Sequence, residues 1–299
     1  MPITPTRKVW LNGDFVAWED AHLHWVNPTL HYGWGVFEGI RAYQTARGPA
    51  VFRLDDHVAR LYRSARVYFL EPKLSPPELT DAITRTIAVN GLDDCYIRPL
   101  LHLGHGEMGL NPLLSTVEAG IAVWPWGAFL PEESTRRGIR AMVSSWRRND
   151  PNTIPPAAKA CGQYLNSTLA KVAALKAGYD EAILLNTHGQ VTDGPTENIF
   201  VVRGRTLVTP PLCDGPLAGI TRASVMRIAT DLGYEAREDH LTRTDLYLAD
   251  EVFLTGTATE IVPVVEVDDR PVGAGTPGPT ALRIAETYQA ACDGQLDRY

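Results

Sequence analysis

The order of apolar and polar positions along the chain predicts a mixture of short strands and helices. The stretch "VWLNGDFV" has two short apolar segments on either side of Asn12-Gly13, a dipeptide typical of two-residue hairpin turns. "LDDHVARLYRSARVYFL" carries apolar residues at helical spacing. "SPPELTDAITRTIAVNG" begins with a capping-box pair, Ser75 and Glu78, and ends at Gly91. We therefore expect a hairpin and two helices, followed by strands in "CYIRPLLHLG" and "EAGIAVWPW".

The second half of the chain shows the same mixture. "IRAMVSSW" predicts a strand and "YLNSTLAKVAALKAG" a helix, and residues 181–210 read as consecutive strands with tight turns. Two further helices are expected in "AGITRASVMRIATDLG" and "GPTALRIAETYQAAC", with a strand, a turn and a strand between them. Strands and helices do not alternate regularly, which argues against a doubly wound parallel sheet. The pattern favours a mixed α,β (α+β) class with largely antiparallel sheets and flanking helices.

One segment interrupts these patterns near the middle of the chain. "PWGAFLPEES" combines two prolines, a glycine and an acidic pair, a composition typical of a connection. The chain has 299 residues, more than a typical single domain contains. We predict a small N-terminal domain (1–124), a linker (125–137) and a large C-terminal domain (138–299).

Composition excludes several classes of protein. Apolar residues make up 44% and charged residues 21% of the chain, and the net charge of −7 argues against a nucleic-acid-binding protein. The four cysteines have no paired spacing, so neither a disulfide framework nor a metal site is expected. The first residues lack the apolar core of a signal peptide, and no apolar run is long enough to span a membrane. We expect a soluble cytoplasmic protein.

Lys159 stands in an unusual context. "IPPAAKACGQY" places this single charge among prolines, alanines, a cysteine and a glycine, although most lysines lie on solvated surfaces. An amine among small apolar neighbours can be neutral and nucleophilic, as a Schiff-base lysine must be. A surface lysine before a helix is the alternative. Two glycine-hydroxyl segments, "LAGITR" and "TGTAT", would suit a phosphate, because backbone N–H groups at helix starts and turns bind anions.

Seven collinear stretches resemble the signatures of branched-chain amino acid aminotransferases, which are fold-type-IV pyridoxal-phosphate enzymes. They are "HYGWGVFEGIRAY", "YIRPL", "MGLNP", "PNTIPPAAKACGQYLNS", "DGPTENIF", "LAGITR" and "ADEVFLTGTATEI". The resemblance extends from the first hairpin to about residue 265 and implies two domains. It implies that Lys159 is the catalytic residue that forms the Schiff base with pyridoxal phosphate and then shuttles the proton.

The resemblance also implies a set of residues that bind the cofactor. Arg60 resembles the family's phosphate arginine, and Tyr164 its partner for the ring hydroxyl. The full set is Arg60, Tyr164, Asp193, Asn198, Ile220, Thr221 and Thr257. Asp193 is a departure, because the family has glutamate at that position. Either Asp193 contacts the pyridine nitrogen, which we favour, or Glu197 replaces it.

The substrate pocket implied by the resemblance is aromatic, with one arginine. Large aromatic side chains suit an aliphatic substrate, while Arg98 in "YIRP" would accept the distal carboxylate of glutamate. The predicted substrate-binding residues are Tyr32, Phe37, Tyr96, Arg98, Trp126, Phe129 and Ala258. "GHGEMGLNP" resembles a loop that reaches the neighbouring subunit's pocket, which implies at least a homodimer.

The resemblance therefore implies ping-pong transamination of L-leucine, L-isoleucine and L-valine with 2-oxoglutarate. Three activities of the same fold are alternatives: D-amino-acid aminotransferase, (R)-amine aminotransferase and aminodeoxychorismate lyase. A non-catalytic carrier of pyridoxal phosphate is another. No nucleic acid, membrane or metal partner is expected.

Overall fold

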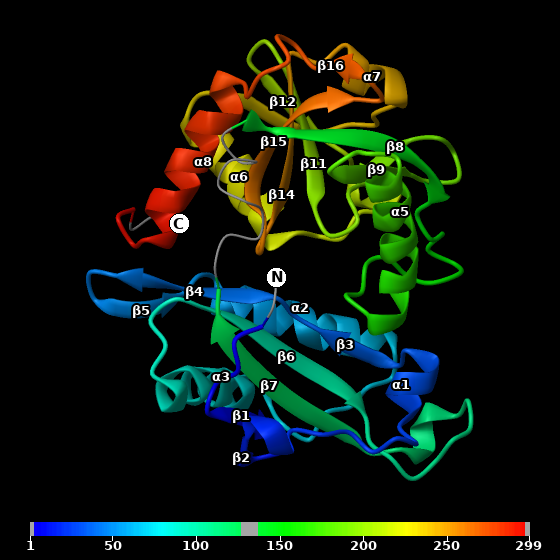
Figure 1. Ribbon diagram of the computed structural model, residues 1–299, viewed down its shortest axis with the longest axis vertical. Coiled ribbons are helices and arrows are strands. Elements are labelled where there is room, and N and C mark those ends of the chain that lie inside the picture. Colours follow the sequence, from blue (N-terminus) through cyan, green and yellow to red (C-terminus); the bar gives the residue numbers. More distant parts are fainter. Residues whose placement is uncertain (1–2, 127–136, 297–299) are drawn as a thin grey trace. The chain divides into compact units, whose positions relative to one another are not determined.

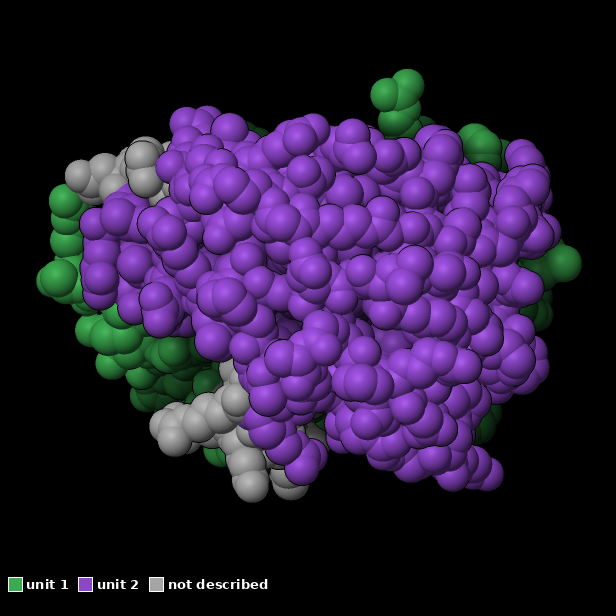
Figure 2. All heavy atoms as spheres, turned by 90° about the horizontal axis from the view of Figure 1, so that it is seen from above, with its two compact units in different colours: residues 1–127, 158–163 green, residues 128–157, 164–299 purple. Residues whose placement is uncertain are grey.

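The computed structural model describes residues 3–126 and 137–296. The chain divides into two compact units, coloured separately in Figure 2. The first unit contains residues 1–127 and 158–163, and the second contains residues 128–157 and 164–299. Within the described residues, no helix is both long and apolar enough to cross a membrane.

The first unit is built around an antiparallel sheet (Figure 1). Among the described residues its strand order is β2-β1-β7-β6-β4-β5, and β3 also pairs with β6. The predicted hairpin forms, and its turn residues Asn12 and Gly13 both have positive φ, 49° and 113°. The strands are β1 (Lys8–Leu11), β2 (Asp14–Ala17), β3 (Gly35–Phe37), β4 (Ile40–Thr45), β5 (Gly48–Val51), β6 (Cys95–Leu103) and β7 (Val117–Pro125).

Two long helices bury one face of this sheet. The predicted capping box forms at Ser75 and Glu78, and Gly91 ends the helix with φ 64°. Alternate residues of β6, such as Ile97 and Leu101, belong to the shared apolar core. The helices are α1 (Pro28–Tyr32), α2 (Leu54–Val67) and α3 (Pro76–Asn90), with short 3-10 helices η1 (Trp18–Asp20), η2 (Pro112–Leu114) and η3 (Cys161–Gln163).

The second unit contains a larger mixed sheet, with the order β10-β9-β8-β15-β14-β11-β12-β13 among the described residues. β16 extends it beside β15. The strands are β8 (Ile139–Arg147), β9 (Glu181–Leu185), β10 (Val191–Asp193), β11 (Asn198–Arg203), β12 (Thr206–Thr209), β13 (Glu235–Glu238), β14 (Glu251–Gly256), β15 (Glu260–Val267) and β16 (Arg270–Pro271). Although most pairings are antiparallel, β8 is parallel to both β9 and β15, and β12 is parallel to β13.

Helices cover this sheet at two places. In Figure 1, α5 lies against β8 and β9, while α6 and α8 lie against β14 and β15. β9 is buried on both faces: Ile183 packs in the main core, and Ala182 and Leu184 pack with α5. The helices are α5 (Tyr164–Lys176), α6 (Ile220–Asp231), α7 (Arg243–Tyr247) and α8 (Pro279–Cys292), with the 3-10 helix η4 (Leu212–Asp214).

The position of residues 158–163 differs from the domain boundaries that the sequence suggested. The sequence placed the whole of 138–299 in one domain, but these six residues belong to the first unit. Backbone bonds explain the difference. Phe37 N–H donates to the Lys159 carbonyl at 3.0 Å, and Gly162 N–H donates to the Gly33 carbonyl at 3.2 Å. A distant segment that pairs in this way leaves no periodic signal in the sequence.

Candidate functional site

The first unit holds the backbone of Lys159 on both sides. Its N–H donates to Oγ of Ser64 on α2 at 3.0 Å, and its carbonyl accepts from Phe37 N–H at 3.0 Å. The next residue, Ala160, forms a bridge with Val36 of β3. The lysine is therefore fixed between a helix and a strand, which suits a residue that must present one amine in one place.

Close backbone contacts explain why the residues around Lys159 are small. A Cβ at Gly33 would lie 2.8 Å from Cα of Gly162, and Gly33 also has φ 68°. Ala158 and Ala160 are buried on either side of the lysine. The small apolar residues noted in the sequence are therefore required by packing of the segment against the residues around Gly33 and β3.

A buried cluster of charged residues lies in the same unit. Arg60 donates from Nε to Oε1 of Glu38 at 2.6 Å and from Nη2 to Oε2 at 2.8 Å. His57 Nδ1 lies 2.8 Å from Oε2, and all three side chains are buried. Burial alone would raise the pKa of Glu38, but Arg60 and His57 hold it well below its usual range. Glu38 is therefore an ionised carboxylate that orients the predicted phosphate arginine.

Arg98 lies among aromatic rings on the other face of the sheet. Its guanidinium carbon is 4.7 Å from the ring centroid of Phe37, 5.3 Å from that of Tyr96 and 5.9 Å from that of Trp124. Trp126 stacks on Tyr96 with centroids 4.3 Å apart. The buried Nε of Arg98 has no hydrogen-bond partner among the described residues. A buried donor of this kind calls for an acceptor, and a carboxylate is the one that arginine prefers.

Phe37 also contacts the catalytic candidate. Nζ of Lys159 lies 5.2 Å from the centroid of the Phe37 ring. The sequence-predicted residues Lys159, Phe37, Arg98, Tyr96 and Trp126 thus form one connected set of contacts in the first unit. Tyr32 belongs to a different environment: it is exposed and donates to the carbonyl of Met108 at 3.2 Å.

In the second unit, three predicted features share one row of the sheet. Asp193 of β10 pairs with Asn198 of β11, and Asn198 pairs with Thr255 of β14. Neighbouring strands lie about 4.8 Å apart, so this row brings the carboxylate close to the "TGTAT" turn. Asn198 also donates from Nδ2 to the Leu217 carbonyl at 2.9 Å, which fixes the loop that leads into α6.

Two backbone segments beside this row are suited to an anion. α6 begins at Ile220 and Thr221 after Gly219, which has no side chain that could cap the helix. A Cβ at Gly219 would lie 1.9 Å from Oδ1 of Asn198, so only glycine fits there. The hydroxyls of Thr255 and Thr259, which flank the turn containing Thr257 and Ala258, are buried without a partner among the described residues. The Thr221 hydroxyl instead lies 3.4 Å from Oη of Tyr288, so its contribution to an anion site would come from its N–H.

Asp193 is buried and is held through a single oxygen. Arg148 contacts Oδ1 from Nε at 2.9 Å and from Nη2 at 2.8 Å. The Thr192 hydroxyl lies 2.8 Å from the same oxygen. Burial raises the pKa of Asp193, and Arg148 opposes this effect. Glu197 is also buried, but its carboxylate accepts from the N–H and hydroxyl of Thr196, which satisfies it locally.

Two sequence-predicted residues remain. Tyr164 is the first residue of α5, and Phe129 lies outside the described residues. Sequence reasoning missed Ser64, Glu38 and Arg148, which hold Lys159, Arg60 and Asp193 respectively. Glu38 is a charged residue inside an apolar stretch, which is a signal in the sequence, whereas Ser64 and Arg148, which stands in the polar stretch "WRRND", have none.

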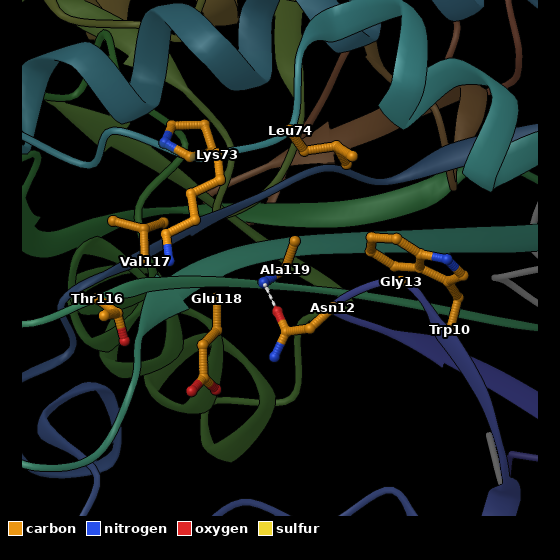
Figure 3. A pocket seen from close by; sticks show the side chains of 10 residues that line it. Trp10, Asn12, Gly13, Lys73, Leu74, Thr116, Val117, Glu118 and Ala119 are labelled. Carbon is orange, nitrogen blue, oxygen red and sulfur yellow. Dashed lines mark hydrogen bonds between the residues drawn. The ribbon is translucent and has the colours of Figure 1, made fainter.

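A separate pocket of about 400 Å³ opens in the first unit (Figure 3). Trp10, Lys73 and Glu118 are among its lining residues, and the Asn12 side chain bonds to Ala119 N–H at 2.8 Å beside it. None of the predicted site residues lines this pocket. The catalytic candidates therefore lie elsewhere.

The family model and the curated relatives that this chain matches are all aminotransferases. Residues 35–267 match the family model described as Amino-transferase class IV. A branched-chain-amino-acid aminotransferase of Escherichia coli (strain K12) is 46% identical over 290 residues, covering 97% of this chain and 94% of that protein. A probable branched-chain-amino-acid aminotransferase of Aquifex aeolicus (strain VF5) is 41% identical over 296 residues. Its alignment covers 97% of this chain and 94% of the relative.

Solved structures agree with these relatives. The crystal structure of the Escherichia coli branched-chain amino acid aminotransferase has a TM-score of 0.96 at 45% identity, and the comparison covers 98% of this chain and 97% of the other. The branched-chain aminotransferase of the thermophilic archaeon Thermoproteus uzoniensis, solved with norvaline, has a TM-score of 0.93, also at 45% identity. That comparison covers 98% of this chain and 97% of the other. A further branched-chain amino acid aminotransferase, solved with pyridoxamine 5'-phosphate, is 48% identical with a TM-score of 0.96 and covers 100% of this chain and 97% of its own.

Proposed function

This chain belongs to the class IV aminotransferases, and we propose that it transfers the amino group of L-leucine, L-isoleucine and L-valine to 2-oxoglutarate with pyridoxal phosphate as cofactor. The observation that carries the proposal is the pair of hydrogen bonds that hold the Lys159 backbone, from its N–H to Ser64 and to its carbonyl from Phe37. They present one amine from a buried segment. The relatives named branched-chain-amino-acid aminotransferase, at 46% identity over 97% of the chain, support the substrate class.

The residues present fit pyridoxal phosphate. The aldehyde needs an amine, which Lys159 supplies, and the pyridine nitrogen needs a carboxylate, which Asp193 supplies. The phosphate needs N–H and hydroxyl donors. The start of α6 and the buried, unpartnered hydroxyls of Thr255 and Thr259 provide them among the residues that the structure describes.

The role of each residue follows from its chemistry. Bound pyridoxal phosphate supplies an aldehyde for the substrate amine and a ring that accepts electrons from the substrate carbon. We assign to Lys159 Nζ the transfer of the proton at the substrate α-carbon. Asp193, rather than Glu197, accepts the pyridine N–H, because Thr196 already satisfies the Glu197 carboxylate. Tyr164 bonds to the ring hydroxyl.

The phosphate ligands complete this assignment. Arg60, oriented by Glu38, pairs with the phosphate, together with the N–H groups of Ile220, Thr221 and Thr257. Asn198 acts indirectly by holding the loop before α6.

Substrate recognition depends on the aromatic face of the first unit. Phe37, Tyr96, Trp126 and Phe129 bind aliphatic side chains by apolar contact. Arg98 pairs with the distal carboxylate of 2-oxoglutarate or glutamate, which gives an acceptor to its Nε, unpartnered among the described residues. Tyr96 and the backbone at Thr257 and Ala258 bind the α-carboxylate. The amino acid and the 2-oxo acid use these groups in turn.

We also propose a homodimer in the cytoplasm. Trp25, Leu110, Leu113 and Leu114 of the first unit are more than 60% exposed, and a group of exposed apolar side chains marks an interface. The His24 and His105 rings stack 5.0 Å apart and link the two segments that carry them. The four cysteines form no disulfide bond, which suits a reducing compartment. Leu110→Asp should lower the mass measured by light scattering, while Leu248→Asp, at another exposed leucine, should not.

The absorption spectrum of the purified protein tests the proposed reaction. A visible band of bound pyridoxal phosphate is expected to disappear when L-leucine is added and to return with 2-oxoglutarate. Lys159→Ala should not respond to L-leucine on the same time scale. A protein without this band, or one whose band ignores L-leucine but responds to D-alanine or an (R)-amine, would contradict the proposal.

A further inference from the structure

Arg148, which contacts the proposed cofactor residue Asp193, is fully hydrogen-bonded within the protein. An arginine has five N–H donors. Nε and Nη2 contact Oδ1 of Asp193, and Nη2 also donates to the Gly194 carbonyl at 2.7 Å. Nη1 lies 3.1 Å from Oγ of Ser167 and 3.3 Å from Oδ1 of Asn166. Each donor thus has an acceptor within the protein, so Arg148 does not serve as a ligand-binding arginine.

The carboxylate of Asp193 is bonded on one side only. Both contacts from Arg148 and the contact from Thr192 reach Oδ1. The Thr192 hydroxyl also lies 3.0 Å from the Leu184 carbonyl, so its single proton serves one acceptor at a time. No hydrogen bond among the described residues reaches Oδ2. This asymmetry keeps one oxygen available as an acceptor.

Burial leaves the pKa of Asp193 raised overall, and the charge and hydrogen bonds of Arg148 act against this by favouring the ionised form. The negative charge of Glu197 raises the pKa of Asp193, and it also raises the pKa of Glu181 of β9. Burial and Glu197 raise the pKa of Glu181 to about 8, although Lys171 lies 2.6 Å away. Arg148 is the cation that lowers the pKa of Asp193, whereas Lys171 pairs with Glu181. Removal of Arg148 would leave an excess of negative charge, and protonation of Asp193 relieves it.

We propose that Arg148 is a positioning residue for transamination, which fixes Asp193 through Oδ1 and keeps Oδ2 as an anionic acceptor for the pyridine nitrogen of pyridoxal phosphate. The inference rests on the proposed function, because the pyridine nitrogen belongs to its cofactor.

The first test uses the apo-protein and is independent of turnover. Carboxyl ¹³C NMR of aspartate-labelled protein follows the titration of Asp193, whose signal is identified by its absence in Asp193→Asn. Arg148→Met should move the titration midpoint upward by at least about one pH unit, since one unit corresponds to about 1.4 kcal/mol of lost charge interaction. Arg147→Met, at the adjacent exposed arginine, should leave it unchanged. An unchanged midpoint in Arg148→Met would overturn the proposal.

The second test uses the holoenzyme. Asp193 must be ionised, so the acid limb of the kcat–pH profile of Arg148→Met should move to higher pH, and activity should recover as the pH rises. The Kd for pyridoxal phosphate should change less than about threefold, because the phosphate ligands are untouched. Arg148→Lys should restore part of the profile, because it keeps the charge but not the five donors. Loss of activity with a weakened Kd and no shift of the acid limb would assign Arg148 a purely structural role.

A milder variant covers the case in which Arg148→Met does not fold. Ser167→Ala removes one acceptor from Nη1 and leaves Asp193 and its charge partner in place, and the same shifts are expected on a smaller scale. No shift in Ser167→Ala, in a protein that folds, would count against the proposal. A wild-type protein with no L-leucine-sensitive band would reject the proposed function, whereas the apo-protein titration would still report on Arg148 and Asp193.

Discussion

Ser64 and Lys159 are joined by a hydrogen bond from the lysine backbone N–H to the serine Oγ at 3.0 Å. Ser64 lies four residues after Arg60 on α2, so both point from the same side of the helix into the buried interior. One helix therefore positions the proposed catalytic lysine and the proposed phosphate arginine.

Replacing Ser64 with alanine should lower kcat by about tenfold, because it removes the acceptor that Ser64 offers to the Lys159 N–H and allows the Lys159 amine to shift. Steady-state kinetics with L-leucine measures the effect. Ser144→Ala is a matched control, since Ser144 is also buried and accepts a backbone N–H, from Trp146 at 3.0 Å. Equal losses in both variants would show that the Ser64 effect is general destabilisation.

Glu38→Gln should reduce stability by about 3–5 kcal/mol at neutral pH, because it leaves the buried Arg60 charge without its carboxylate. Since the pKa of Glu38 is depressed in the folded protein, its stabilising effect is complete above about pH 4.5 and is lost as the pH falls below that value. Urea midpoints between pH 3.5 and 7 should therefore fall less steeply with acid in Glu38→Gln than in wild type. If the urea midpoints of the two proteins fell in parallel with pH, Glu38 would not be the ionised carboxylate inferred here.

Arg98→Met should raise KM for 2-oxoglutarate by about 10- to 100-fold, because a charge-assisted hydrogen bond to a carboxylate contributes about 1.5–3 kcal/mol. L-leucine has no distal carboxylate, so its half-reaction should change much less. Single-turnover measurements with each substrate separate the two effects. Arg98→Lys should not restore recognition, because lysine lacks the planar fork. Equal losses for both substrates would remove Arg98 from this role.

Gly39→Ala should weaken the recognition of 2-oxoglutarate by Arg98, through a displacement of Tyr96. The added Cβ would lie 1.9 Å from Oη and 2.8 Å from Cζ of Tyr96, whose hydroxyl is 3.4 Å from Nη2 of Arg98. We expect a stability loss of about 1–3 kcal/mol from overpacking and a higher KM for 2-oxoglutarate. A double-mutant cycle with Tyr96→Phe tests whether Gly39→Ala acts through the Tyr96 hydroxyl. If it does, the effects of the two substitutions on stability and KM should be less than additive. Full additivity would mean that Gly39 acts elsewhere.

Local signals in the sequence predicted much of the fold. The Asn12-Gly13 hairpin and the Ser75–Glu78 capping box both form, because each depends on residues close together in the chain. The family resemblance is confirmed by the comparisons. The parallel pairing of β8 with β9 and β15 was not predicted, because register between distant strands depends on the packing of both faces.

In the candidate site, too, residues in local motifs could be predicted from the sequence, and contacts between distant residues could not. Motifs identified Lys159, Asp193 and the two glycine-hydroxyl segments, but they did not identify the side chains that hold them. Ser64 is 95 residues from Lys159, and Arg148 is 45 residues from Asp193. A supporting contact across that distance depends on the folded backbone and has no fixed spacing in the chain. The roles assigned to the site residues remain predictions.

The assignment of residues 158–163 to the first unit has a consequence for recombining this protein with its relatives. A chimaera joined once, near residue 127, would give Lys159 a foreign serine, a foreign β3 and a foreign glycine to pack against. A hybrid that also exchanges the short 158–163 insert would carry the lysine together with its native supports. Exchange of whole units in this architecture therefore requires three crossover points.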